Sequence, residues 1–118
     1  MITQELFDTI YRGLAGQGWV KSYDQDADLC MYRGPNNHKC AIGHLIPDEM
    51  YHHSMDDSVA GVMAYGEFRK LELHPALTRD EFNELQDLHD SSDEDDPTHM
   101  RRRFEEFARN HNLVIPTP

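Results

Sequence analysis

Cysteine and basic residues are both scarce in this chain. Of its 118 residues, two are cysteines and 11 are lysine or arginine, against 22 aspartates and glutamates, so the formal charge is −11. Two cysteines are too few for a disulfide-rich secreted scaffold. The negative charge opposes binding to nucleic acid or to an anionic membrane, and it favours a basic partner or solubility alone.

Long apolar runs and the common catalytic motifs are also missing. No apolar segment approaches the length of a membrane span, and MITQELFDTI has no basic region followed by an apolar block, as a signal peptide would. The segment GLAGQG lacks the order of a phosphate-binding glycine loop, and neither G-x-S-x-G nor H-E-x-x-H occurs. We therefore expect a cytoplasmic protein with reduced thiols, and a non-enzymatic role is favoured.

Apolar spacing predicts a helix near the start of the chain. Apolar residues recur every four positions from Leu6 to Leu14, and Thr3 precedes them as a good N-cap. Two closely spaced glycines follow and are expected to end this helix. The aromatic and β-branched segments 19–23 and 29–33 predict two short strands that close as a hairpin.

The second half of the chain carries two further helix starts. Thr78 and Glu81 form a capping box ahead of an apolar stripe, and Asp96 precedes Pro97 as the N-cap of a last helix. Between them and the hairpin, residues 56–73 are typical of a helix weakened by two glycines. The buried stripe of the last helix is expected to contain Met100, Phe104, Phe107 and Ala108.

Together these elements predict one small acidic globular domain over residues 1–118. A chain of this length buries roughly two-thirds of its unfolded surface, so a single core suffices. No internal repeat and no linker divides the sequence. The expected fold class is mainly α (α+β), with four to five helices packed with one small N-terminal β-hairpin.

Two cysteines and two histidines gather in the stretch CMYRGPNNHKCAIGHLIPDEMY, residues 30–51. Cys30, His38, Cys40 and His44 supply two sulfurs and two nitrogens, a donor set that zinc accepts. The spacing lacks the close cysteine pair of structural zinc sites, and the apolar neighbours of Cys40 indicate burial. Core thiols are the favoured interpretation, and a zinc site or a redox pair remains open.

The same stretch resembles a signature of small uncharacterised proteins encoded in bacteriophages and prophages, C-x-Y-R-G…K-C-A-I-G-x-L-I-x-D-x-x-Y. The later segments LQDLHD and FARNHNL are similar too, so the resemblance spans most of the chain. It implies a phage or prophage origin and assigns no chemistry. The signature includes both cysteines, but neither His38 nor His44 is part of it.

The signature residues also suit a structural role. Arg33 is expected to hydrogen-bond exposed carbonyls at a turn or to pair with Asp48. Gly43 is expected to let the short helix over residues 38–46, capped by Asn37, approach another backbone closely.

Acidic side chains are concentrated in the segment 80–96, which contains nine of them and no lysine or arginine. Asp80, Glu84 and Asp87 fall on one face of the capped helix. The segment indicates either a solvated surface or a partner-binding face, and the three arginines at 101–103 could neutralise it internally. A calcium loop is a weaker alternative, because the EF-hand glycine and closing glutamate are missing.

The first functional hypothesis is a non-catalytic protein that binds the basic surface of a host or phage protein, such as a nucleic-acid-binding protein, as an inhibitor or DNA mimic. It needs no cofactor and contacts neither nucleic acid nor membrane directly. The alternatives are a small zinc-binding or hydrolytic protein that uses the Cys/His cluster, and a scaffold or oligomerisation module. The partner-binding residues expected under the first hypothesis are Asp80, Glu84, Asp87, Asp90 and Glu94.

Overall fold

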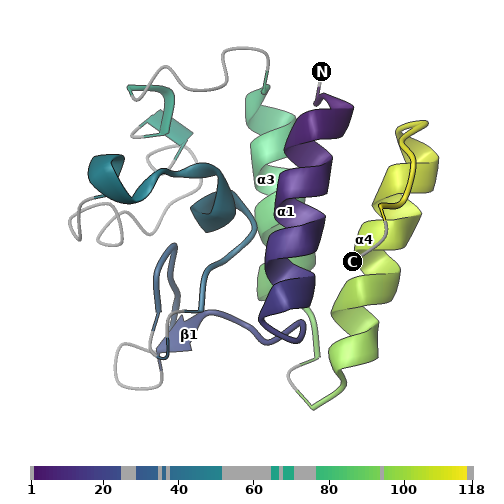
Figure 1. Ribbon diagram of the computed structural model, residues 1–118, viewed down its shortest axis with the longest axis horizontal. Helices are drawn as coiled ribbons and strands as arrows, with labels where there is room; N and C mark the ends of the chain where they lie inside the picture. Colours follow the sequence, from purple (N-terminus) through teal and green to yellow (C-terminus); the bar gives the residue numbers. More distant parts are fainter. Residues whose placement is uncertain are drawn as a thin grey trace.

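Three α-helices form the frame of the molecule in the computed structural model: α1 (Gln4–Gly16), α3 (Arg79–Asp90) and α4 (Pro97–Asn110) (Figure 1). α1 and α3 run in the same direction, and α4 runs in the opposite direction and packs against both. The structure describes residues 2–24, 29–34, 36, 38–51, 65–66, 68–70, 77–93 and 95–116, with the backbone alone at 24, 29, 30 and 97.

The remaining described elements are short and lie mainly on the side of α1 away from α4 (Figure 1). The 3-10 helix η2 packs against both α1 and α3, so it belongs to the core rather than to an outer loop. These elements are β1 (Tyr23–Asp24), β2 (Leu29–Cys30), η2 (Ile42–Leu45) and η3 (Asp48–Met50).

The caps of α1 explain where this helix begins and ends. The Thr3 hydroxyl accepts the N–H of Leu6, as predicted for an N-cap. At the other end Gly18 has a left-handed φ of 74°, and the N–H of Trp19 donates to the carbonyl of Leu14 at 2.9 Å. This six-to-one bond is the signature of a Schellman motif, which satisfies carbonyls that the helix leaves free.

The two predicted helix starts in the second half of the chain are confirmed. The Thr78 hydroxyl accepts the N–H of Glu81 at 3.2 Å, and the Glu81 carboxylate accepts the N–H of Thr78 at 3.1 Å. The Asp96 carboxylate accepts the N–H of Thr98 at 3.1 Å, with Pro97 at the first helical position. Both arrangements satisfy backbone donors that lack partners at a helix start.

Aromatic side chains join the helices in the core. Phe7 of α1 stacks on Phe107 of α4 with ring centroids 5.9 Å apart, and Trp19 meets the edge of Tyr11 at 4.9 Å. Pairs of this kind contribute beyond the apolar area that they bury. The stripe predicted for α4 is confirmed, because four side chains are buried at the predicted positions: Met100, Phe104, Phe107 and Ala108.

The expected fold class, mainly α (α+β) with four to five helices packed with one small N-terminal β-hairpin, is wrong. The described part of the chain is a small helical protein in which three α-helices have described bounds. Besides an isolated bridge between Arg33 and Lys39, strand pairing there is limited to two residue pairs between β1 and β2, far short of the two five-residue strands expected. The pairs are Tyr23 with Cys30 and Asp24 with Leu29.

The backbone at residues 18 and 19 explains why the first strand does not form as expected. Gly18 and Trp19 both have positive φ, 74° and 59°, whereas a strand requires extended residues. Trp19 therefore belongs to the turn that ends α1, and its ring packs toward Tyr11 and Phe104. Tertiary packing of the indole overrides the strand propensity of the segment 19–23.

Neither of the two other expected helices, over residues 38–46 and 56–73, is seen in full among the described residues. The helix expected over residues 38–46 is only the 3-10 turn η2, and the expected cap, Asn37, lies outside the described residues. Most of the segment 56–73 also lies outside them. The backbone is helical at four of its described residues, Tyr65, Gly66, Phe68 and Arg69.

Gly43 in η2 brings two backbone segments together, as its place in the signature predicts. A Cβ at this position would overlap the carbonyl oxygen of Tyr32 and lie 3.0 Å from its carbonyl carbon. Both residues are buried, so neither segment can move into solvent to make room. The close approach fixes η2 against Tyr32, in the segment between β2 and Arg33.

We predict that Gly43→Ala lowers the free energy of unfolding by about 1–3 kcal/mol, the usual cost of overpacking a buried site. Gly16→Ala is the matched control, because a Cβ at Gly16 meets nothing within 4 Å and alanine favours a helix by about 0.5–1 kcal/mol. Urea denaturation of both variants measures the difference. Equal stabilities would contradict the close approach.

Candidate functional site

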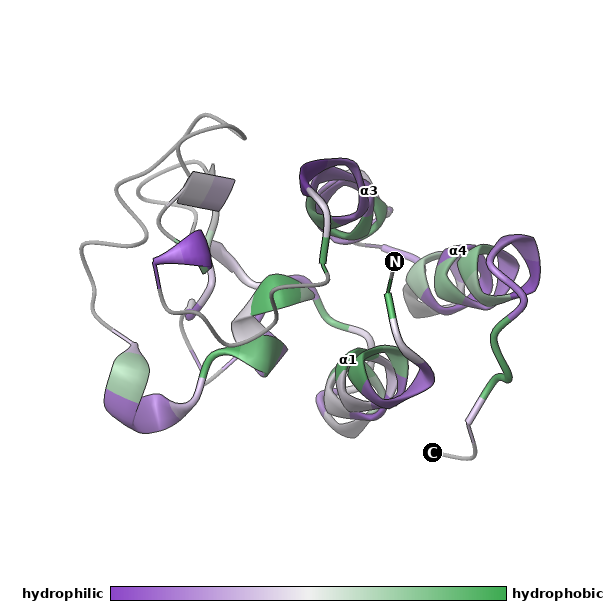
Figure 2. Ribbon diagram, turned by 90° about the horizontal axis from the view of Figure 1, so that it is seen from above, coloured by the Kyte–Doolittle hydropathy of each residue, from purple (hydrophilic) through white to green (hydrophobic). Residues whose placement is uncertain are grey.

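The exposed side of α3 carries four of the five predicted partner-binding residues. Asp80, Glu84, Asp87 and Asp90 are exposed, whereas the opposite side of the helix buries Phe82, Leu85 and His89. Figure 2 shows this division, with the hydrophobic side of α3 turned toward the other helices. We call these four carboxylates the acidic face; the fifth predicted residue, Glu94, lies outside the described residues.

Two side chains from α4 and its C-cap approach the acidic face, and one of them, Arg103, is a counter-charge. Arg103 of α4 approaches Asp87 at 3.6 Å, and His111 approaches Glu84 at 3.4 Å. Asp80 has no ion-pair partner among the residues that the structure describes. Exposed pairs of this type contribute only about 0–1 kcal/mol each, so a partner could replace them at small cost.

The other two arginines of the predicted neutralising group act elsewhere. Arg101 pairs with Glu105 at 3.1 Å within α4, and Arg102 approaches Asp96 at 3.5 Å beside the helix N-cap. The arginines of α4 therefore reach the acidic face at one position only, Asp87, within the described part of the chain.

A buried histidine that sequence reasoning missed fixes one end of the acidic face. His89 is fully buried, its Nε2 accepts the N–H of Ser22 at 3.0 Å, and its Nδ1 lies 2.8 Å from the Asp90 carboxylate. Because an N–H donor requires an acceptor, the ring is neutral with its proton on Nδ1. The signal was available, since His89 follows Leu85 by four residues on the apolar side of α3.

The residues of the predicted zinc set make other contacts. Cys40 is a buried free thiol whose sulfur accepts the N–H of Gly43 at 3.3 Å. The His44 ring packs over Gly13 of α1, where a Cβ would overlap it, and its Nε2 lies 3.1 Å from the Gln17 amide oxygen. The Cys30 side chain lies outside the described residues, and those described contain no group of three or more metal-ligating side chains suited to an ion.

Burial lowers the pKa of His44 from 6.5 to about 4, and the positive charges of Lys39 and Arg33 add to this effect. His44 is therefore neutral at pH 7, with its Nε2 proton donated to the Gln17 oxygen. A neutral ring lying against a glycine of α1 acts as core filling.

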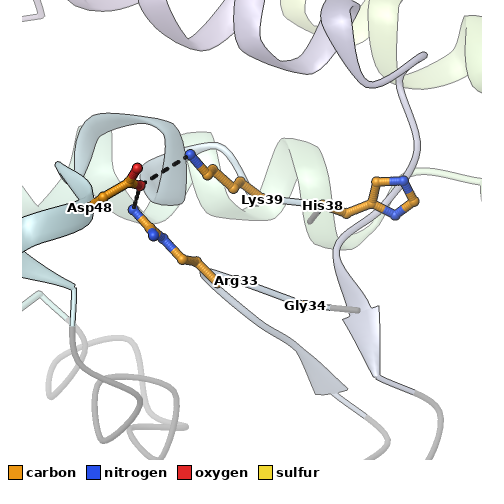
Figure 3. Close-up of a pocket in the computed structure, with 5 residues that line it drawn as sticks. All are labelled: Arg33, Gly34, His38, Lys39 and Asp48. Atoms are coloured by element: carbon orange, nitrogen blue, oxygen red, sulfur yellow. Dashed lines mark ion pairs between the residues drawn. The ribbon is translucent and has the colours of Figure 1, made fainter. Parts of the chain in front are cut away.

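A polar cavity of about 350 Å³ lies between η3 and the segment that follows β2, and sequence reasoning did not identify it as a site. Two cations converge on one carboxylate there: Arg33 Nη2 lies 2.7 Å and Lys39 Nζ 3.8 Å from Asp48 Oδ1 (Figure 3). Gly34 and His38 complete the lining, although the His38 side chain extends away from the ion pairs. We call this region the cationic pocket.

Backbone contacts position the two cations. Arg33 and Lys39 pair across an antiparallel bridge, so their side chains start next to each other. The side-chain amide of Gln17 holds the backbone of Lys39 from both sides, with its oxygen 3.0 Å from the N–H and its nitrogen 2.8 Å from the carbonyl. The expected ion pair of Arg33 with Asp48 is confirmed, whereas the carbonyl that Arg33 contacts, at 3.0 Å, belongs to the buried Ile46 at the end of η2 and not to an exposed residue of the expected turn.

Comparisons of the chain with family models, curated proteins and solved structures give no match. Among the described residues, no helix has both the length and the apolar character needed to cross a membrane.

We predict that the pKa of His44 makes the protein less stable in acid. Between about pH 6.5 and pH 4 the unfolded chain binds a proton at this residue and the folded chain does not, so stability falls as the pH falls. Urea denaturation of the wild type and of His44→Gln at several pH values isolates this contribution. The wild type should lose more stability on acidification than the variant does. Parallel curves would show that His44 is not buried in the neutral form.

Proposed function

We propose that this protein is a non-catalytic, phage- or prophage-derived protein that binds a basic surface of a host or phage protein through the acidic face. A nucleic-acid-binding protein is the favoured partner, because its basic groove is built to accept rows of negative charge. Binding there would inhibit the partner. The observation that carries the proposal is the exposure of Asp80, Glu84, Asp87 and Asp90 on a helix whose other side is buried.

The spacing of the acids supports a phosphate-like role along part of a groove. Ten residues of helix rise about 15 Å from Asp80 to Asp90, so four carboxylates are spaced by about 5 Å. One strand of DNA carries one charge per about 3.4 Å, and the duplex one per about 1.7 Å. The acidic face thus approaches the charge density of a single strand, which favours competition for a basic groove over imitation of a whole duplex.

The pairs with Arg103 and His111 are compatible with this role. Arg103 belongs to α4 and His111 is its C-cap, and both contacted carboxylates, Asp87 and Glu84, are about half or more exposed. A basic partner would replace these weak exposed contacts, and Asp80, which has no ion-pair partner among the described residues, would supply the new attraction. The phage or prophage origin rests on the signature in residues 30–51, in which Arg33, Gly43 and Asp48 have structural contacts.

We predict that Asp80→Lys combined with Glu84→Lys weakens partner binding by roughly tenfold or more, because reversal turns two attractions into repulsions and 1.4 kcal/mol corresponds to tenfold. Immobilised protein would capture proteins from a bacterial lysate at two salt concentrations. Capture by the wild type should weaken at the higher salt, because exposed charges are screened.

The matched control is Glu5→Lys combined with Glu49→Lys. It makes the same change in net charge, and it also places one lysine in the first turn of an α-helix. Both variants should melt within a few degrees of each other, and the control should retain capture. Equal capture by both variants would exclude the acidic face as the binding surface.

A further inference from the structure

The cationic pocket is a concentration of positive charge in a chain whose net charge is −11. Arg33 and Lys39 contribute two positive charges and Asp48 one negative charge, so these three side chains leave one positive charge. We propose that this cavity binds a phosphate group, either as the free ion or as a phosphate monoester. The site is on the segment that follows β2 and on η3, and it uses none of the residues of the acidic face, so it goes beyond the proposed function.

The guanidinium of Arg33 is held in place with one donor left over. The Tyr51 ring lies 4.6 Å from its central carbon, and Nη2 bonds the Ile46 carbonyl and Asp48. The Nε atom is buried and has no hydrogen-bond partner among the described residues. A buried donor without an acceptor is unfavourable, so an anion oxygen that reaches it would gain affinity.

Asp48 occupies the place where the anion would bind. One of its oxygens contacts both cations, yet the side chain is 81% exposed and is attached to a short 3-10 helix. Such an exposed carboxylate is an easily displaced internal competitor. Phosphate has more oxygens and more charge than one carboxylate, and it matches the planar fork of an arginine.

The size of the cavity also bears on the ligand. At about 350 Å³ it exceeds the volume of a phosphate ion, so there is room for an organic group attached to the phosphate. Gly34 lines the same cavity, and a Cβ there would lie 2.7 Å from the Ser22 hydroxyl, so this wall is formed by backbone packed against Ser22, the residue before β1.

A purely structural role for the arginine makes a different prediction. In that case Asp48 anchors Arg33, and removing the carboxylate would weaken the fold without creating affinity for anions. A substitution of Lys39 distinguishes the two roles. Its ammonium lies 3.8 Å from Asp48, too far for a close hydrogen bond, and its backbone is held independently by Gln17. Removing its charge should therefore weaken the binding of an anion and have little effect on the contact between Asp48 and Arg33.

The test is calorimetric titration of the purified protein with inorganic phosphate and with O-phosphoserine, at constant ionic strength set by chloride. We expect saturable binding that becomes about two- to fivefold tighter in Asp48→Asn, where the competitor is neutral, and weaker by a similar factor in Lys39→Met. Tighter binding of O-phosphoserine would assign the rest of the cavity to an organic group. Equal binding would assign the site to the phosphate alone.

Thermal melting of each variant without ligand verifies that it is folded. Asp48→Asn changes an exposed side chain, and if it does not fold, the comparison of Lys39→Met with the wild type still decides the question. Absence of saturable binding in every folded variant, or binding that Lys39→Met leaves unchanged, would overturn the proposal.

Discussion

The contact between the backbone of Gly43 and the carbonyl of Tyr32 determines the geometry of the central part of the molecule. It sets η2 against the segment that leads into Arg33, and η2 in turn packs on α1 and α3. In the sequence, the two cations of the pocket lie between Tyr32 and Gly43, and the carboxylate that they contact follows Gly43. A change at Gly43 would therefore alter the core and the pocket together, because Arg33 directly follows Tyr32 in the chain.

Side chains that bind backbone groups replace much of the pairing that a larger sheet would supply. Gln17 holds both polar groups of Lys39, and His89 accepts the N–H of Ser22 from the interior of α3. Each bond satisfies backbone groups in segments that lack regular secondary structure, which buried groups require. In this way the three helices hold an irregular stretch of chain in one position, and β1 and β2 need only two residue pairs.

Local sequence signals predicted the three long α-helices well, but not the helix expected over residues 38–46 or the strands. The capping box at Thr78, the N-cap at Asp96 and the glycine that ends α1 act over a few residues, so they can be read without tertiary information. The strand expected from Trp19 failed because its indole packs in the core, and the ion pairs of the acidic face come from α4. The periodicity of one helix indicates which side of it is apolar. Whether a side chain such as His89 is buried also depends on the segments that pack against that side, and the helix sequence alone does not identify them.

The two hydrogen bonds between the Gln4 side chain and the backbone of Val114 join positions that are 110 residues apart in sequence. The N-terminal turn of α1 and the last described segment are thus neighbours in space. A circularly permuted chain that connects these segments by a short linker, with new termini in the exposed α3–α4 loop at Ser91 or Asp93, would preserve both sites. In such a chain α3 and α4 would become the last and first helices, and their antiparallel packing would form without a direct connection.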